Sequence, residues 1–148
     1  MGKIPKKQAI SIAVQRVNLE KVYSEIIEDI SCKCDVLSCT LRLKPTAESL
    51  IYKVLIKYDI LHSPQVWLLD PPLKKYDRKN VHHIYKLDKK GHPKLCVYHP
   101  KYDKWNGHML LVNTFIPWVI TWLFAYEYWL ITGKWAYPEI LENKKDIQ

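Results

Sequence analysis

The chain has 148 residues, 48% of them hydrophobic, and a formal net charge of +8. This length and apolar content are enough for one compact domain with a substantial core and too little for two. The sequence contains no repeat, low-complexity segment or glycine-rich phosphate loop. We therefore expect a single domain over residues 1–148, with flexible ends at 1–7 and 143–148.

The positive charge is concentrated in one segment. Between Lys74 and Lys104, ten lysines and arginines stand against three aspartates, a net of +7. Such a segment is either a solvated loop face or a docking surface for an acidic partner, and it also favours the thiolate form of a neighbouring cysteine.

The N-terminal part is expected to be helical. From about Gln8 to Ile30 the apolar residues recur mostly every three or four positions, which is typical of an amphipathic helix. These residues are Ile10, Val14, Val17, Val22, Tyr23, Ile26, Ile27 and Ile30.

Three strands are expected next. Alternating apolar residues from Leu37 to Leu43, followed by the turn Lys44-Pro45-Thr46, predict the first strand. The same alternation predicts a second from Leu50 to Tyr58, with one buried face, and a third from Gln65 to Leu69 that ends at Asp70-Pro71-Pro72. Strands this close in sequence most simply form an antiparallel meander.

The residues from Leu73 to Gly107 have no regular periodicity and are expected to form a long irregular region. Long loops in compact domains are usually functional or disordered. Aromatic and β-branched residues here argue against disorder. Four of the six histidines lie in this region, and a fifth, His108, directly follows it. The four are His82, His83, His92 and His99.

The apolar stretch from Met109 to Thr132 raises the question of a membrane span. A helix that starts at Pro117 and stops at Gly133 has only about fifteen residues, short of the roughly twenty that cross a bilayer. We expect a core helix and no transmembrane span, with a helix lying on a membrane surface as the alternative. Its aromatic stripe is Trp118, Trp122, Tyr126 and Trp129.

The four cysteines differ in their surroundings. If Cys32 to Leu43 is one strand, Cys32 and Cys34 point to one face and Cys39 to the other, so the three do not share a metal and are ordinary core residues. Cys96 lies among histidines, prolines and lysines, a setting that favours a nucleophilic thiolate. Four cysteines without a secretory signal lead us to expect a reduced, cytoplasmic protein.

The order of these features resembles the ubiquitin-conjugating enzymes over nearly the whole chain. In that family a His-Pro-Asn motif and an Asp-Gly turn precede a hydrophobic-Cys step, and a tryptophan follows. The corresponding residues are His83-Ile84-Tyr85, Asp88 with Gly91, Leu95-Cys96-Val97 and Trp105. The resemblance implies an α+β fold with an N-terminal helix, an antiparallel meander sheet, a long active-site loop and an aromatic-rich C-terminal helix.

The departures from this pattern indicate a particular branch. The His-x-Tyr motif and the tryptophan-rich helix are similar to the prokaryotic ubiquitin-conjugating-like proteins of antiphage islands, above all the stand-alone protein of type II short CBASS operons. This resemblance implies a defence protein whose cysteine carries the C-terminus of a cGAS-like nucleotidyltransferase, transfers it to an acceptor amine and so regulates cyclic-nucleotide signalling. The chain has no ATP-binding element, so a separate activating enzyme or an already activated donor is required.

The residue chemistry is compatible with acyl transfer without a cofactor. Cys96 is expected to be the nucleophile and acyl carrier. Tyr85 occupies the place of the family's asparagine and is expected to donate to the developing charge on the carbonyl oxygen, while His83 orders the loop. The general base is left open between Asp88, Asp103 and His99.

Two other classes of function remain open. One is a binding module of the same fold in which Cys96 is incidental. The other is a basic nucleic-acid-binding domain with aromatic stacking platforms, although no recognisable nucleic-acid motif supports it.

Overall fold

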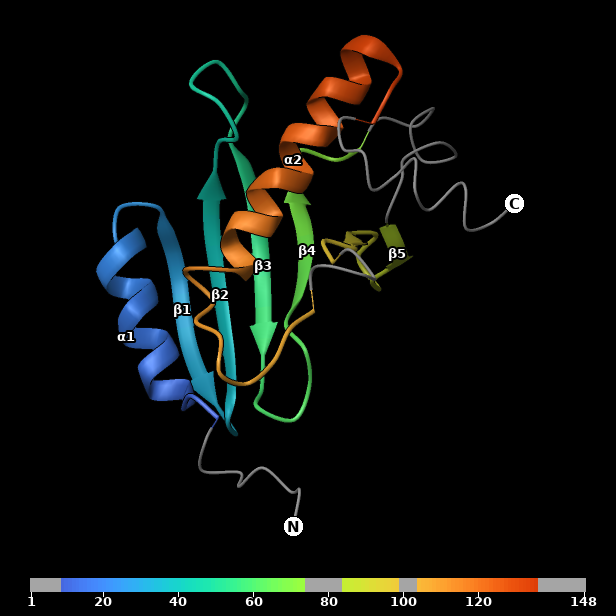
Figure 1. The fold of residues 1–148 in the computed structure, drawn as a ribbon. Coiled ribbons are helices and arrows are strands. Elements are labelled where there is room, and N and C mark those ends of the chain that lie inside the picture. Colours follow the sequence, from blue (N-terminus) through green and yellow to red (C-terminus); the bar gives the residue numbers. More distant parts are fainter. Residues whose placement is uncertain (1–8, 74–83, 99–103, 136–148) are drawn as a thin grey trace.

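The structure, a computed structural model, describes residues 9–73, 84–98 and 104–135. Within them six strands form one sheet in the order β1-β2-β3-β4-β6-β5, with each neighbouring pair antiparallel. Helix α2 lies across one face of the sheet and α1 lies beside the β1 edge (Figure 1). The predicted α+β architecture is confirmed, and the ends expected to be flexible, 1–7 and 143–148, lie outside the described residues. The elements are α1 (Ile12–Tyr23), β1 (Ile27–Lys33), β2 (Val36–Leu43), β3 (Tyr52–Tyr58), β4 (Gln65–Asp70), β5 (Ile84–Leu87), β6 (Pro93–Leu95) and α2 (Phe115–Thr132).

The predicted antiparallel meander is confirmed by β2, β3 and β4. Buried residues alternate along these strands with half-buried or exposed ones. Leu50 departs from the prediction, because it lies outside β3 and is 65% exposed. The buried side chains form one cluster with α2, and burying each large one stabilises the fold by about 1.5–3 kcal/mol. They are Leu37, Cys39, Leu41, Leu43, Tyr52, Val54, Ile56, Tyr58, Val66 and Leu68.

The N-terminal helix is shorter than the predicted span from Gln8 to Ile30. It ends at Tyr23. Ile26 lies in the turn that follows, and Ile27 and Ile30 belong to β1. The register of β1 against β2 shifts between Ile27 and Asp29, which places Ile27 and Ile30 on the same, core-facing side. A bulge thus produces a three-residue spacing in a strand, and this spacing imitates a helix in the sequence.

The predicted arrangement of the first three cysteines is wrong. Cys34 and Asp35 form a tight turn between β1 and β2, with φ angles of 52° and 61°. Cys32 therefore pairs across the hairpin with Leu37, which puts it on the same face as Cys39. Cys39 is a core residue as expected, but Cys32 and Cys34 are exposed. The residues that the structure describes contain no cluster of three metal-ligating side chains.

The region from Leu73 to Gly107 is not irregular throughout, because it contains β5 and β6. These strands have four and three residues. Such lengths are too short to show an alternation that would identify a strand. They extend the sheet beyond β4, on the side away from α1 (Figure 1).

Helix α2 begins at Phe115, two residues before the predicted start at Pro117. Proline is tolerated there because the first turn of a helix does not need its N–H group. The predicted stop is confirmed: Gly133 adopts a φ of 76° and donates its N–H to the carbonyl of Trp129 at 2.8 Å. The core-helix prediction is confirmed too, since α2 buries Phe115, Ile116, Val119, Trp122, Leu123, Ala125 and Tyr126.

The acidic residue of α2 is held by hydrogen bonds. Glu127 accepts from the hydroxyl of Ser49 at 2.6 Å and from that of Tyr52 at 2.9 Å, which ties the helix to β3 and the loop before it. No helix among the described residues is both long and apolar enough to cross a membrane.

A buried amide attaches α1 to the chain segment that leads into α2. Gln15 is 0% exposed. Its side chain donates to the carbonyl of Met109 at 2.8 Å and accepts from the N–H of Leu111 at 2.9 Å. One side chain therefore satisfies two backbone groups that would otherwise lack a partner in the interior.

Replacing Gln15 with leucine should destabilise the protein. The change fills the space but leaves the Met109 carbonyl and the Leu111 N–H without partners, at a cost of about 1–3 kcal/mol for each buried group. Urea unfolding should report a lower midpoint at an unchanged slope. The control is Arg16→Ala, which removes an exposed ion pair to Glu20 and should leave the midpoint nearly unchanged. Equal midpoints for the Gln15 variant and the wild type would contradict this account.

Candidate functional site

The candidate site is built on the hairpin of β5 and β6, whose turn is organised by Asp88. The backbone N–H of Asp88 donates to the carbonyl of His92 at 2.8 Å, and Gly91 closes the turn with a φ of 86°. The Asp88 carboxylate accepts from the backbone N–H groups of Lys90 and His92 at 2.9 and 2.8 Å, and its second oxygen lies 3.1 Å from Nδ1 of His92. Hydrogen bonds, that of the His92 backbone foremost, lower the pKa of Asp88.

These contacts give Asp88 a structural role in the turn. A carboxylate with a lowered pKa holds its negative charge and is a weak proton acceptor. Among the three residues left open as general base, Asp88 is therefore occupied by the hairpin, while His99 and Asp103 lie outside the described residues.

One bridge joins the hairpin to the main sheet, where Lys94 of β6 pairs with Trp67 of β4. Pro93 and Leu95 on either side of Lys94 are buried. Val97 is buried as well, so the half-buried Cys96 lies between two residues that are anchored in the core.

The Cys96 thiol lies beside the side chain of Tyr85. Burial first, and then hydrogen bonding to Cys96, raise the pKa of Tyr85 to about 12. The hydroxyl therefore keeps its proton at neutral pH and is available as a donor. In the structure the thiol itself donates weakly to the carbonyl of Tyr98, with the sulfur 3.8 Å from the oxygen.

Tyr98 fixes the chain immediately after the cysteine. Its hydroxyl donates to the carbonyl of Pro64 at 2.5 Å. Its ring packs against Phe115 and Trp118 of α2, with ring centroids 5.7 and 5.6 Å apart. The segment that carries Cys96 is thus held by the residue before β4 on one side and by α2 on the other.

Positive charge lies close to the thiol. Nζ of Lys94 is 4.8 Å from the centroid of the Tyr85 ring, and Nζ of Lys57 is 5.9 Å from that of Trp67. Rings in this position attract ammonium groups through their negative faces. The first contact places the ammonium group of Lys94 over the ring of Tyr85, the residue beside the Cys96 thiol.

A small apolar cavity of about 260 Å³ lies where the hairpin meets β4. It is lined mainly by Leu68, Leu73, Ile84, Leu87 and Pro93. Sites for small-molecule ligands usually occupy about 300–1,000 Å³ and contain several converging polar groups. This cavity fits an apolar side chain better than a cofactor.

The structure brings together only part of the site that the sequence predicts. Cys96 and Tyr85 are neighbours, whereas His83 lies outside the described residues. Trp105, the expected downstream tryptophan, packs edge-on against Tyr58 with ring centroids 5.2 Å apart and therefore supports the core. The sequence places Lys94 among the cationic neighbours of Cys96, but it does not predict the contact of Lys94 with the Tyr85 ring, which depends on the pairing of β5 and β6.

Comparison with protein families gives a match to the type II CBASS E2 protein family over residues 15–143. The chain belongs to this family. The resemblance seen in the sequence is confirmed, and the fold is the E2-like fold that the family implies. Comparison with curated proteins gives no match.

The matched range includes all six strands, α2 and all of α1 except its first three residues. Cys96 and Tyr85 lie within the match. The match therefore identifies the chain as an E2-like protein associated with CBASS.

The cysteines of this CBASS E2 protein should differ in reactivity. Burial raises the pKa of Cys39 to about 12 from 9.0, so its thiol stays protonated and inaccessible in the folded state. Iodoacetamide at about pH 8 should label Cys32, Cys34 and Cys96 in the native protein but Cys39 only in urea, as peptide mass spectrometry will show. Because the folded-state pKa of Cys39 is the higher one, its contribution to stability is present below pH 9.0 and is lost as the pH rises towards 12. Native labelling of Cys39, or protection of Cys96, would contradict the described burial.

Proposed function

We propose that the protein is a thioester carrier in which Cys96 accepts the activated C-terminus of another protein and passes it to an amine. The observation that supports this proposal best is the donor hydroxyl of Tyr85 beside the half-buried thiol of Cys96, in a chain of the E2 family. A thiol with a fixed donor next to it has the minimum equipment for acyl transfer.

The first step loads the cysteine. The Cys96 thiolate attacks the activated carbonyl carbon, a C–S bond forms, and the bond to the leaving group of the donor breaks. Negative charge develops on the carbonyl oxygen during the attack, and the Tyr85 hydroxyl donates to it. The ammonium group of Lys94, over the Tyr85 ring, favours this oxyanion electrostatically.

The second step unloads it. A neutral amine attacks the thioester carbonyl, a C–N bond forms, the C–S bond breaks and the Cys96 thiolate leaves. The amine gives up one proton to a base. The same tyrosine donor serves both steps, because the charge develops on the same carbonyl oxygen.

The protein carried on Cys96 is, in this proposal, the cGAS-like nucleotidyltransferase of the CBASS system, and conjugation of its C-terminus regulates antiphage signalling. The family assignment supports a partner within CBASS. Activation of the carboxyl terminus requires a separate enzyme or a donor that is already activated. His83 is proposed to order the loop before β5.

The carrier proposal predicts a covalent adduct on Cys96. Incubation with a peptide thioester as a ready-activated donor should add the mass of the peptide acyl group, and dithiothreitol should remove it. Cys96→Ala should abolish the adduct, whereas Cys32→Ala, which alters an exposed thiol far along the chain, should retain it. The same test with nucleotidyltransferase, activating enzyme and ATP should give a thiol-sensitive band on non-reducing gels. If neither donor forms an adduct with the folded wild type, the protein is a binding module and not a carrier.

A second prediction separates the role of Tyr85 from general effects on the thiol. Tyr85→Phe keeps the ring under Lys94 but removes the donor, so transfer from the peptide thioester should slow by about a hundredfold, the typical cost of one oxyanion donor. Alkylation of Cys96 by iodoacetamide develops no oxyanion and should change much less. Equal slowing of both reactions would show that Tyr85 acts on the thiolate, and no slowing of either would remove it from the mechanism.

A further inference from the structure

The edge of the sheet that carries Cys96 has more positive charge than its own acidic residues neutralise. The described residues from 84 to 98 contain four lysines and one aspartate. None of these lysines forms an ion pair with a carboxylate of a described residue. The lysines are Lys86, Lys89, Lys90 and Lys94.

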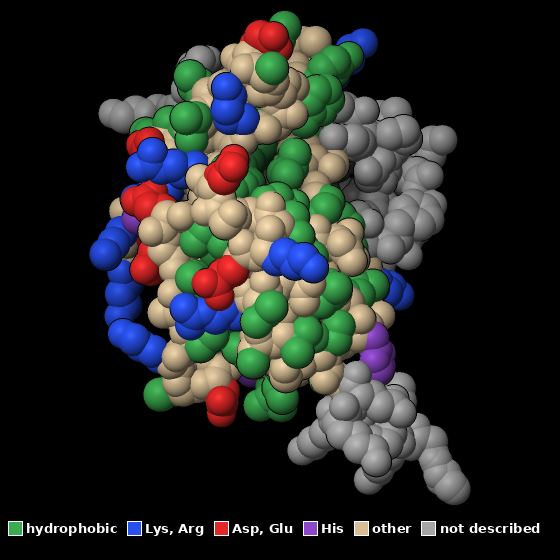
Figure 2. All heavy atoms as spheres, turned by 90° about the vertical axis from the view of Figure 1, so that its left-hand side faces the viewer, with side chains coloured by type: hydrophobic (Ala, Val, Ile, Leu, Met, Phe, Trp, Pro, Cys, Tyr) green, Lys and Arg blue, Asp and Glu red, His purple; other side chains and the backbone are tan. Residues whose placement is uncertain are grey.

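The other edge of the sheet differs in this respect. There Arg42 and Lys53 both pair with Glu28, at 3.0 and 2.9 Å, and Arg16 pairs with Glu20 at 3.0 Å. Figure 2, which views the molecule from the side of α1, shows basic and acidic side chains interspersed. Three basic side chains near α1 are therefore neutralised locally, whereas none of the four hairpin lysines has such a partner among the described residues.

Three of the hairpin lysines line an open groove with two aromatic residues. We call this the lysine groove and define it by Trp67, Tyr85, Lys86, Lys89 and Lys94. Among the described residues that line it, Asp88 carries the only carboxylate, and both oxygens of that group are engaged within the hairpin turn. The lysine groove thus presents a positive field with aromatic surface beneath it.

The groove is also prepared for binding. The contact of Lys94 with the Tyr85 ring holds its ammonium group in place. A charged side chain that is already positioned loses less conformational freedom when it binds an anionic group. Tyr85 lines the groove and its side chain lies beside Cys96, so this residue joins the groove to the surroundings of the thiol.

We propose that the lysine groove binds acidic residues close to the C-terminus of the protein carried on Cys96. This inference rests on the proposed carrier function. A chain bonded to the Cys96 sulfur through its terminal carbonyl leaves the thiol past Tyr85, and each extended residue covers about 3.3–3.6 Å, so the residues just before the terminus reach the lysines. Carboxylate side chains at these positions pair with the lysines that have no acidic partner in the hairpin. The groove therefore selects acidic tails over neutral ones.

Binding is tested apart from chemistry, on the Cys96→Ala protein. The probes are two fluorescein-labelled peptides of equal length, one with glutamates before a glycine terminus and one with glutamines in their places. The glutamate peptide should bind more tightly, by about threefold for each lysine it meets, and its advantage should fall as salt rises from about 0.05 to about 0.5 M. Equal affinity of the two peptides in fluorescence anisotropy would overturn the proposal.

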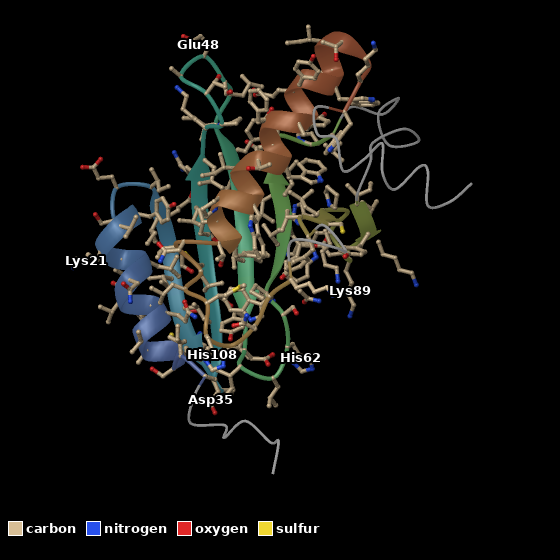
Figure 3. The ribbon with its side chains drawn as sticks, viewed as in Figure 1. Lys21, Asp35, Glu48, His62, Lys89 and His108 are labelled. Carbon is tan, nitrogen blue, oxygen red and sulfur yellow. The ribbon has the colours of Figure 1, made fainter. Side chains whose placement is uncertain are left out.

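The variants locate the effect. Lys86→Gln with Lys89→Gln leaves the contact between Lys94 and Tyr85 intact and should weaken binding of the glutamate peptide by about tenfold. Reversal of the same two charges to glutamate should make the protein prefer a lysine peptide. The matched control is Lys21→Gln, since Lys21 lies on α1 at the opposite edge from Lys89 (Figure 3) and should not affect binding. A double variant that binds like the control would overturn the proposal.

Two further arms separate this inference from its alternatives. A single-stranded thymidine oligonucleotide that binds more tightly than the glutamate peptide would overturn the proposal in favour of nucleic acid. Loading of wild-type Cys96 from thioesters of both peptides distinguishes a failure of the groove proposal from a failure of the carrier proposal. Equal loading rates at low peptide concentration would overturn the selective groove but leave the carrier in place, whereas no loading from either would overturn the carrier even if the groove binds the acidic peptide.

Discussion

A single bridge between Trp67 and Lys94 positions the candidate site. It joins the hairpin of β5 and β6 to β4, and β4 is itself fixed by its pairing with β3 and by the buried core. Because successive residues of a strand point to opposite faces, the burial of Pro93 and Leu95 leaves Lys94 at the surface. Cys96 is the residue directly after β6, a short strand that is anchored in the core. Sites on anchored elements keep their geometry better than sites on free loops.

Within the hairpin, opposite charges have separate tasks. The carboxylate of Asp88 points into the turn, where it accepts hydrogen bonds from two backbone N–H groups and contacts the ring of His92. The lysines remain outside and keep the surroundings of Cys96 positive. Tyr85 adds a donor without adding charge, because its pKa of about 12 keeps the phenol neutral. Such an arrangement favours an oxyanion that develops beside Tyr85.

The sequence predicted the elements that have enough residues to show a period. The meander and the long C-terminal helix were of this kind, including the stop at Gly133. The bulge between Ile27 and Asp29 made the same reasoning predict a helix where β1 lies, because one extra residue turns an alternating pattern into a helical one. Cys32 was misplaced for a related reason, since the turn at Cys34 resets which face a residue occupies. The hairpin strands were too short to be recognised, so the proximity of Lys94 to Tyr85, which depends on their pairing, was out of reach.

The tyrosine in place of the family's asparagine bears on whether the protein is a carrier or an inactive relative. An oxyanion donor needs an N–H or O–H group held near the carbonyl oxygen, and the phenol meets the first requirement as well as an amide does. The second depends on rigidity. Tyr85 is about half exposed, but its ring lies under the ammonium group of Lys94 and its side chain lies beside the thiol. Alanine or leucine at this position would have left the thiol without a donor and favoured a binding module. A phenol beside the thiol therefore supports the proposed carrier, with a donor that differs from that of the ubiquitin-conjugating enzymes.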